Sequence, residues 1–273
     1  MKVLVTGSEG YIGQHLCQMI EQIRPEIELY RIDKDMNDSS IKRLYVDITE
    51  SWQLFSTQDE HFDAVIHLAA LVKVGESVKT PSAYYDTNIN GTRNVIHNLS
   101  YDNFIYASTG AASSPDSPYG YSKLAGEHIV RELCPNYTIF RFYNVIGSYG
   151  FAPTNPEGLM LNLLKAKDWG QFTIFGSDYN TKDGTCVREY VHVNDICRAL
   201  IKAIDKPSNQ VENLAYNDAR TTKEIVELFL KVNEIDCNVI YGPRRPGDLE
   251  ACYLENPSSY MERNYTYEEM LKI

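Results

Sequence analysis

Residues 6–13, TGSEGYIG, limit the possible folds of this chain more than any other segment. They follow an apolar run at residues 2–6 that is typical of a short buried strand, and they open an amphipathic helical pattern at residues 11–23. In such a unit one glycine makes the tight turn, a second lets the backbone approach a pyrophosphate, and a third lets the helix pack on the strand. The helix N-terminus then offers N–H groups and a positive dipole end to phosphates. The segment predicts a dinucleotide site, formed by Gly7, Gly10, Tyr11, Ile12 and Gly13.

Asp33 provides the second half of this signal. It lies about 20 residues beyond Gly13, at the end of a second predicted strand (residues 27–32). A carboxylate at that place accepts both ribose hydroxyls of NAD, whereas its negative charge repels the 2′-phosphate of NADP. We therefore expect NAD as the cofactor. Further cofactor contacts are expected where later strands end, at Asp47, Ile48, Leu68, Ala69 and Ala70.

Strand patterns alternate with helical ones along the first half of the chain. Strands are predicted at residues 2–6, 27–32, 43–46, 64–68, 103–107 and 137–141, and helices at residues 11–23, 82–99 and from Pro118 onward. This alternation indicates an α/β fold with a Rossmann-type doubly wound parallel sheet. The pattern becomes irregular after Asn144. We expect a dinucleotide-binding domain at residues 1–144, with residues 187–205 returning to it, and a smaller, partly interleaved C-terminal substrate domain at residues 145–186 and 206–273.

Tyr119 and Lys123 are the candidates for chemistry, because they lie four residues apart at the start of a predicted helix and hence on one face. A phenol with a pKa near 10 is a poor base at neutral pH. A lysine ammonium and a positively charged nicotinamide ring nearby would lower the pKa of the phenol, so that it can exchange a proton with a hydroxyl. Tyr121 is a rival phenol, but it lies off the face of Lys123. His67 is interpreted as a structural histidine.

Composition excludes several classes of partner. The chain of 273 residues has a net charge of −11, which argues against nucleic acid or an anionic membrane as a general partner. The six cysteines are scattered, with no Cys-x-x-Cys pair or metal-ligand spacing, so neither a disulfide framework nor a metal site is expected. No apolar run approaches the roughly 20 residues that span a bilayer. We expect no signal peptide and a cytoplasmic location.

At this point the chain resembles the extended short-chain dehydrogenases/reductases, and among them the NAD-dependent sugar-nucleotide epimerases, closest to the UDP-glucose (UDP-galactose) 4-epimerases. The resemblance covers nearly the whole length. Besides the segments above, it is carried by residues 74–78 (VGESV), 84–92 (YYDTNINGT), 103–105 (NFI), 117–120 (SPYG), 184–193 (GTCVREYVHV) and 243–248 (PRRPGD).

The resemblance implies a reaction and a set of residue roles. A UDP-hexose would be epimerised at carbon 4 through transient oxidation to a 4-keto sugar, with NAD remaining bound. A homodimer through residues 82–99 and 118–133 is also implied. Thr109 would hydrogen-bond the reacting oxygen beside Tyr119 and Lys123, with Ser108 as the fallback. The remaining implied roles are cofactor support by Asn88, diphosphate or sugar contacts by Asn144 and Asn162, diphosphate binding by Arg188 and Arg245, and a uridine ribose contact by Asp248.

The chain departs from the family pattern at three places. Residues 33–47 and 109–119 are shorter than usual, and Val72 stands where the family often has a lysine. Cys252 stands where family members carry a tyrosine or a smaller residue, and a small side chain leaves room for a 2-acetamido group. Acceptance of UDP-N-acetylhexosamines is therefore a hypothesis.

Three other functions remain open at this point. A nucleotide-sugar 4,6-dehydratase is disfavoured, because Gly110 and Ala111 follow Thr109 where those enzymes have an Asp-Glu pair. A uronate epimerase or decarboxylase is harder to exclude. An NAD-sensing scaffold, the non-enzymatic alternative, commonly lacks the tyrosine or the lysine.

Overall fold

The computed structural model describes residues 1–36, 42–51, 53–54, 60–147, 150–153, 155, 158–245, 248–253 and 258–273. The chain divides into two compact units, which are considered separately. Unit 1 comprises Met1–Phe142 and Cys197–Glu212, and unit 2 comprises Tyr143–Ile196 and Asn213–Ile273. The sequence placed the returning segment at residues 187–205, whereas this division places it at Cys197–Glu212. The roles of the two units stay predictions.

Unit 1 is built on a seven-stranded sheet with the strand order β11-β6-β5-β4-β1-β2-β3, in which the last two residues of β11 fall past the division at Glu212. The strands are β1 (Lys2–Thr6), β2 (Glu28–Asp33), β3 (Arg43–Tyr45), β4 (His61–His67), β5 (Ser100–Thr109), β6 (Tyr137–Phe142) and β11 (Val211–Leu214). The pairs from β3 across to β6 are all parallel. Strand β1 is buried along four of its five residues, as expected for a strand that is covered on both faces.

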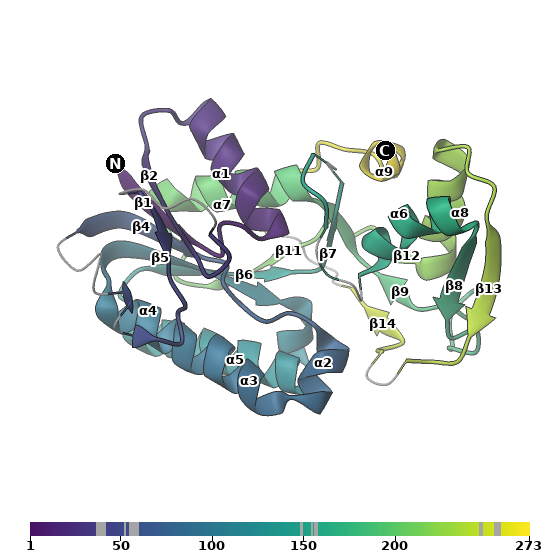
Figure 1. The fold of residues 1–273 in the computed structure, drawn as a ribbon, viewed down its shortest axis with the longest axis horizontal. Helices are drawn as coiled ribbons and strands as arrows, with labels where there is room; N and C mark the ends of the chain where they lie inside the picture. The colour runs from purple at the N-terminus through teal and green to yellow at the C-terminus, as the bar shows by residue number, and fades with distance from the viewer. Residues whose placement is uncertain are drawn as a thin grey trace. The chain divides into compact units, whose positions relative to one another are not determined.

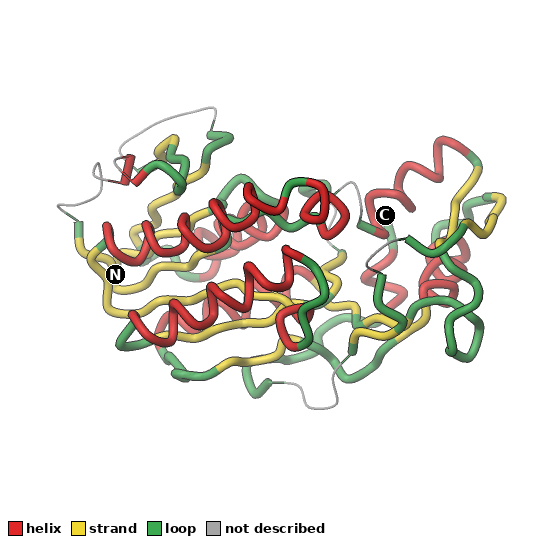
Figure 2. Tube along the Cα trace, turned by 90° about the horizontal axis from the view of Figure 1, so that it is seen from below, coloured by secondary structure: helices red, strands yellow, loops and turns green. Residues whose placement is uncertain are grey.

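Helices cover both faces of this sheet (Figure 1). Helices α1 (Tyr11–Ile23) and α7 (Val193–Asp205) lie on one face. On the other lie α2 (Val74–Lys79), α3 (Pro81–Tyr85), α4 (Thr92–Asn98) and α5 (Pro118–Leu133). Figure 2 shows the helices of unit 1 running along the strands. This layered arrangement is a Rossmann-type fold, so the predicted fold class is confirmed.

The strand order reverses at β1, and this reversal decides where a ligand can bind. From β1 the chain continues outward to β2 and β3 on one side, and then returns to β4 and β5 on the other. In open parallel sheets the carboxyl ends of the strands at such a reversal leave a crevice that binds ligands. The glycine segment follows β1, and residues 68–70, where cofactor contacts are expected, follow β4.

The predicted helix at residues 82–99 has an internal irregularity. Helix α3 and helix α4 are joined by a π-helical turn at Asp86–Gly91. The predicted helical character is thus confirmed, but the periodicity of apolar residues did not indicate the π-helical turn. Helix 11–23 is confirmed with the predicted bounds, and helix α5 begins at Pro118 as predicted. Its N-cap, Ser117, accepts a hydrogen bond from the N–H of Gly120 at 3.3 Å.

Unit 2 consists of short sheets and helices around its own core. Strand β7 (Asn144–Ile146) pairs with β10 (Tyr190–His192), β8 (Gln171–Phe175) pairs with β13 (Asn238–Gly242), and β9 (Val187–Arg188) lies between β12 (Arg220–Thr221) and β14 (Ala251–Cys252). The helices are α6 (Leu159–Trp169), α8 (Thr222–Val232) and α9 (Tyr267–Leu271). Leu163, Phe229 and Met270, one from each helix, are fully buried in this core.

Candidate active site

The glycine segment forms a turn that only glycines can make. Gly7 has a φ of +71°, and a Cβ atom there would lie 2.6 Å from the backbone nitrogen of Ala69. A Cβ atom on Gly13 would lie 2.2 Å from the carbonyl oxygen of Gly7. Gly10 is the N-cap of α1 and brings no side chain to the first turn. The close packing of strand, turn and helix is therefore the cradle that a pyrophosphate needs.

Asp33 lies beside this turn. Its Oδ2 accepts a hydrogen bond from the N–H of Glu9 at 2.9 Å, and its Oδ1 accepts one from the N–H of Asp35 at 3.0 Å. These bonds fix the carboxylate at the end of β2, next to the glycine segment. Each oxygen keeps further acceptor capacity, so ribose hydroxyls fit this position. The structure thus brings together the two halves of the predicted dinucleotide signal.

The residues expected after β3 and β4 occupy different settings. Asp47 closes a turn, since its Oδ1 accepts from the N–H and the hydroxyl of Thr49 at 2.9 and 2.8 Å. Ile48 is buried against Gly91, where a Cβ atom would lie 2.8 Å from its Cδ1. Leu68 donates its N–H to the carbonyl oxygen of Thr6, and Ala69 to the Thr6 hydroxyl. Leu68 and Ala69 therefore line the glycine turn, with Ala70 next in the chain.

Asn88 holds the wall of this site in place. It is fully buried in the π-helical turn, and its Oδ1 accepts from the N–H of Leu71 at 2.8 Å. Its Nδ2 donates to the carbonyl oxygen of Leu71 and to the hydroxyl of Ser122, both at 2.9 Å. One amide thus ties the segment after β4 to helix α5. π-Helical turns are frequent at functional sites.

His67 is a structural histidine, as the sequence indicated. Its Nδ1 lies 2.7 Å from the hydroxyl of Thr6, and its Nε2 lies 3.1 Å from the hydroxyl of Thr92. Burial, together with the charge of Lys123, lowers the pKa of His67 to about 3, so the ring is neutral at physiological pH. Both ring nitrogens are occupied in joining β1 to helix α4.

Tyr119 and Lys123 lie on one face of helix α5, as predicted. The phenol of half-buried Tyr119 is hydrogen-bonded to the Thr109 hydroxyl at the end of β5. Lys123 is only 3% exposed, and its Nζ lies 4.2 Å from the centroid of the Tyr106 ring. The three residues expected to carry the chemistry are therefore neighbours in unit 1.

Desolvation dominates the electrostatics of this pair in the absence of a bound cofactor. Burial raises the pKa of Tyr119, and the hydrogen bond from Thr109 only partly opposes that rise. Burial also lowers the pKa of Lys123 to about 7, and the negative charge of Glu127 opposes this fall. The expected fall applies to a phenol beside a bound nicotinamide ring as well as the ammonium, so it stays a prediction. Desolvation of both groups is the opposing effect that the sequence did not indicate.

The sequence left two candidates, Thr109 and Ser108, for the hydroxyl beside Tyr119. In the structure these two hydroxyls have different partners. Ser108 is buried and donates to Oε1 of Glu127 at 2.5 Å, whereas Thr109 is bonded to Tyr119. Sequence reasoning missed Glu127 and its partner Arg141. A signal was present, since Glu127 follows Lys123 by one helical turn and therefore shares its face.

In unit 2, three of the residues expected to bind a sugar nucleotide lie in one neighbourhood. Arg188 donates from Nη2 to the carbonyl oxygen of Leu249 at 2.6 Å. Asp248, the residue before Leu249, pairs with Arg245 through an Nε–Oδ2 contact of 2.9 Å. The guanidinium of Arg245 also lies 5.1 Å from the centroid of the Phe175 ring. Pro246 and Gly247 of the same block lie outside the described residues.

The two asparagines of the prediction lie in separate elements of unit 2. The Nδ2 of Asn144, on β7, donates to the carbonyl oxygen of Glu189 at 3.0 Å, and Glu189 follows Arg188 in the chain. Asn162 lies in the first turn of α6, where its Nδ2 donates to the carbonyl oxygen of Gly158 at 2.8 Å.

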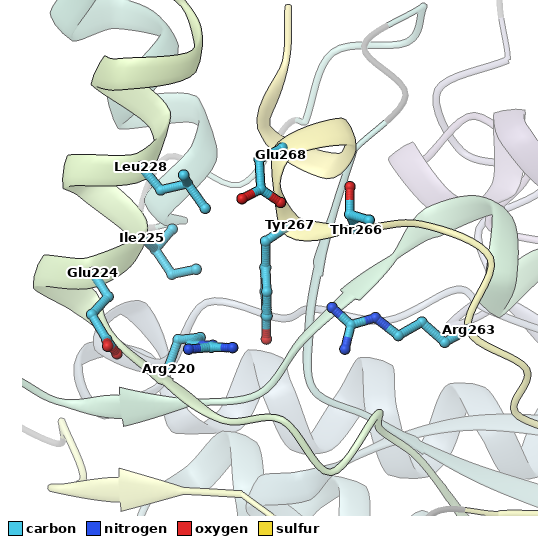
Figure 3. A pocket seen from close by; sticks show the side chains of 8 residues that line it. All are labelled: Arg220, Glu224, Ile225, Leu228, Arg263, Thr266, Tyr267 and Glu268. Atoms are coloured by element: carbon cyan, nitrogen blue, oxygen red, sulfur yellow. The ribbon is translucent and has the colours of Figure 1, made fainter.

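A separate cavity of about 310 Å³ opens in unit 2 (Figure 3). Arg220 and Arg263 point toward the side chain of Tyr267 there, and Glu224 and Glu268 contribute opposite charges. Both arginines are paired with Asp218, at 2.9 and 2.8 Å. The charges around this cavity are thus largely balanced. None of the residues that are predicted to bind substrate lines the cavity.

The residues that the structure describes contain no group of histidine, cysteine and carboxylate side chains that could hold a metal ion. Within the same residues, no helix has the length and apolar character needed to cross a membrane.

The fold and the glycine turn define a nucleotide-binding protein of the Rossmann type. A model of the NAD dependent epimerase/dehydratase family matches residues 3–218. The UDP-glucose 4-epimerase of Pasteurella multocida (strain Pm70) is 30% identical over 100% of this chain and 96% of the relative. That of Lactobacillus helveticus is 34% identical over 92% and 87%. The chain belongs to the NAD dependent epimerase/dehydratase family.

Solved structures agree with this assignment. The UDP-glucose 4-epimerase from Bifidobacterium longum in complex with NAD+ and UDP matches with a TM-score of 0.86 and 27% identity, over 99% of this chain and 96% of that one. The UDP-Glc/GlcNAc 4-epimerase from Campylobacter jejuni matches with a TM-score of 0.81 and 28% identity, over the same shares. The Pasteurella alignment runs over 325 positions, so that relative carries segments that this chain lacks.

Replacement of Asn88 by alanine tests the role of its amide in the wall of the site. The substitution leaves the N–H and carbonyl of Leu71 without this partner, and we expect the free energy of unfolding to fall by about 3 kcal/mol. Chemical denaturation measures the effect. Asn90→Ala is the matched control, because Asn90 is exposed in the same turn and should cost below about 0.5 kcal/mol. Equal losses in both variants would contradict the assigned role.

Proposed function

We propose that this chain epimerises a UDP-hexose at carbon 4, interconverting UDP-galactose and UDP-glucose by transient oxidation, with NAD as a bound cofactor. The observation that carries the proposal is the joint placement of Tyr119, Thr109 and Lys123 in a Rossmann-type unit. Membership of the epimerase/dehydratase family and the similarity to UDP-glucose 4-epimerases support it.

Unit 1 is the proposed NAD site. The glycine turn would hold the pyrophosphate, and Asp33 would accept the ribose hydroxyls; its charge favours NAD over NADP. The remaining contacts proposed in unit 1 come from Tyr11, Ile12, Asp47, Ile48, Leu68, Ala69, Ala70 and Asn88. The chemistry that NAD supplies when it is bound is the acceptance and return of hydride at the sugar carbon.

Tyr119 is the proposed acid and base of the reaction. Its phenolic oxygen would take the proton of the 4-hydroxyl when carbon 4 is oxidised, and return it when the keto sugar is reduced on the other face. Thr109 would orient the reacting oxygen through its hydroxyl. The charge of Lys123 would favour the phenolate form of Tyr119.

Unit 2 is the proposed site for the UDP part of the substrate. Arg188 and Arg245 would bind the diphosphate, since guanidinium groups match phosphate oxygens in geometry and charge. Asp248 would accept from the uridine ribose, and Asn144 and Asn162 would contact the diphosphate or the sugar. Arg245 and Asp248 pair with each other in the structure, so this role requires them to exchange partners.

The test of this function is conversion of UDP-galactose by the purified protein without added NAD. We expect turnover in the wild type and a loss of about 10²-fold or more in Tyr119→Phe, because the variant lacks the proton-transferring oxygen. Tyr121→Phe is the matched control, since this neighbouring phenol is 53% exposed and should be dispensable. Product analysis by NMR separates epimerisation from dehydration. Undiminished turnover in Tyr119→Phe would refute the proposed base.

We further propose that UDP-N-acetylhexosamines are accepted. Cys252 on β14 is in register with Arg188 on β9, so the residue at 252 lies beside a proposed diphosphate ligand. Its small side chain leaves space that a tyrosine would fill.

Substitution of Cys252 by tyrosine should therefore be selective. We expect turnover of UDP-N-acetylglucosamine to fall about tenfold or more, while turnover of UDP-galactose changes little. Cys237→Tyr makes the same exchange at another half-buried cysteine of unit 2 and serves as control. Absence of wild-type turnover of the N-acetylated substrate, with UDP-galactose converted, would eliminate the proposal.

We also propose a homodimer and a cytoplasmic location. The family resemblance points to helices α3, α4 and α5 as the interface, and two aromatic side chains there are exposed, Tyr85 at 39% and Tyr121 at 53%. All six cysteines are free thiols, which suits a reducing compartment.

Light scattering after size-exclusion chromatography tests the dimer. The wild type should elute with twice the chain mass of 31.2 kDa, and Tyr121→Glu should shift the mass to one chain because it places a charge in the interface. Tyr45→Glu is the control, since this exposed tyrosine lies on the edge strand β3. A wild type of single-chain mass would rule out the dimer under those conditions.

A further inference from the structure

Glu127 is a buried carboxylate in helix α5 that the proposed chemistry does not use. It is 2% exposed, and Arg141 donates to it from Nε and Nη2 at 2.8 and 2.7 Å. Ser108 donates to the same Oε1 that accepts from Nε. Burying an ion costs free energy unless it is paired and hydrogen-bonded, and here both conditions are met. This negative charge is therefore held in a fixed position, where it can stabilise a positive charge on a neighbouring group.

Lys123 lies one helical turn before Glu127 on the same face. Its Nζ stands over the ring of Tyr106, which supplies a weak attraction but no counter-ion. Burial lowers the pKa of Lys123 to about 7, and Glu127 is the charge that opposes this. Because this pKa lies close to neutral pH, a small change in the electrostatic potential at the amine changes the charged fraction of Lys123 substantially.

Within the described part of the chain, Glu127 is the one negative charge that raises the pKa of Lys123. His67 on β4 is neutral, and it stacks with Tyr106 at a centroid distance of 5.8 Å. Burial keeps the phenols of Tyr106 and Tyr119 protonated, because it raises the pKa of both. Arg141 on β6 is cationic and pairs with Glu127.

We propose that Glu127 is a positioning residue for the reaction: its carboxylate, fixed by Arg141 and Ser108, keeps the buried Lys123 amine charged beside Tyr119. This inference rests on the proposed function for its catalytic meaning, because a charged lysine is what favours the phenolate. The effect of Glu127 on the charge of Lys123 involves residues of unit 1 and can be measured on the protein without ligands.

The alternative role for Glu127 is purely structural, since its pair with Arg141 also joins α5 to β6. The two roles differ in one measurable property. A structural pair contributes to stability, whereas an electrostatic partner also shifts the titration of Lys123. The decisive measurement is therefore the titration midpoint of one lysine and not activity alone.

The experiment is NMR titration of the intact protein labelled with ¹³C at the lysine ε-carbons. Lys123→Arg assigns the resonance by its disappearance. We expect a wild-type midpoint near 7, and a downward shift of about one unit or more in Glu127→Gln, because the amide keeps the shape and removes the charge. Glu132→Gln makes the same exchange at an exposed site of the same helix and should leave the midpoint unchanged.

A second variant covers the case in which Glu127→Gln fails to fold because it leaves a buried guanidinium unpaired. The double variant Glu127→Gln/Arg141→Gln removes both charges and should still lower the midpoint of Lys123. Unchanged midpoints in folded variants would overturn the inference and leave only the structural role.

Activity measured on the same proteins distinguishes the two proposals. If UDP-galactose is converted, the high-pH limit of activity should move to lower pH in Glu127→Gln, because the lysine loses its charge at lower pH. A shifted Lys123 midpoint with no turnover by the wild type would refute the proposed function and retain the role of Glu127.

Discussion

The close approach of helix α5 to strand β5 is the constraint on which the site depends. Gly126 makes this approach possible, because a Cβ atom there would lie 2.1 Å from the hydroxyl oxygen of Tyr106. The helix therefore lies directly on the ring that Lys123 covers. Lys123 is buried in this contact, and Ser122 is buried beside Asn88. Without it, the tyrosine and the lysine would still share a helix face, but that face would be solvated.

Local sequence signals were sufficient to predict where the main helices and strands of unit 1 form. The apolar run of β1 and the amphipathic pattern of residues 11–23 act over short distances, and each element formed where it was expected. Pro118 and Ser117 likewise fix the start of α5 through backbone geometry and capping. Spacing on that helix was enough to place Tyr119 and Lys123 together, because the helical repeat is rigid.

Features that depend on long-range packing were not predictable in this way. The π-helical turn carries Asn88, whose side chain hydrogen-bonds to Leu71 and Ser122, which lie 17 and 34 residues away in the sequence. The neutral state of His67 and the raised pKa of Tyr119 arise from burial, which a linear pattern does not quantify. The pairing of Arg245 with Asp248 was also missed, since the sequence assigned each of them to a ligand and not to one another.

The pKa shifts of Tyr119 and Lys123 have a common origin in burial, and both oppose the charged forms that the proposed reaction needs. Desolvation favours the neutral form of each group, so burial alone gives a protonated phenol and an uncharged amine. A positive nicotinamide ring beside them would lower both pKa values, which helps the phenol to ionise but discourages charge on the lysine. An anion that lies closer to the lysine than to the tyrosine raises the pKa of the lysine more than that of the tyrosine. Such an anion keeps the amine charged while the phenol can still ionise. Glu127 follows Lys123 by one turn and Tyr119 by two, so the helix itself provides that asymmetry.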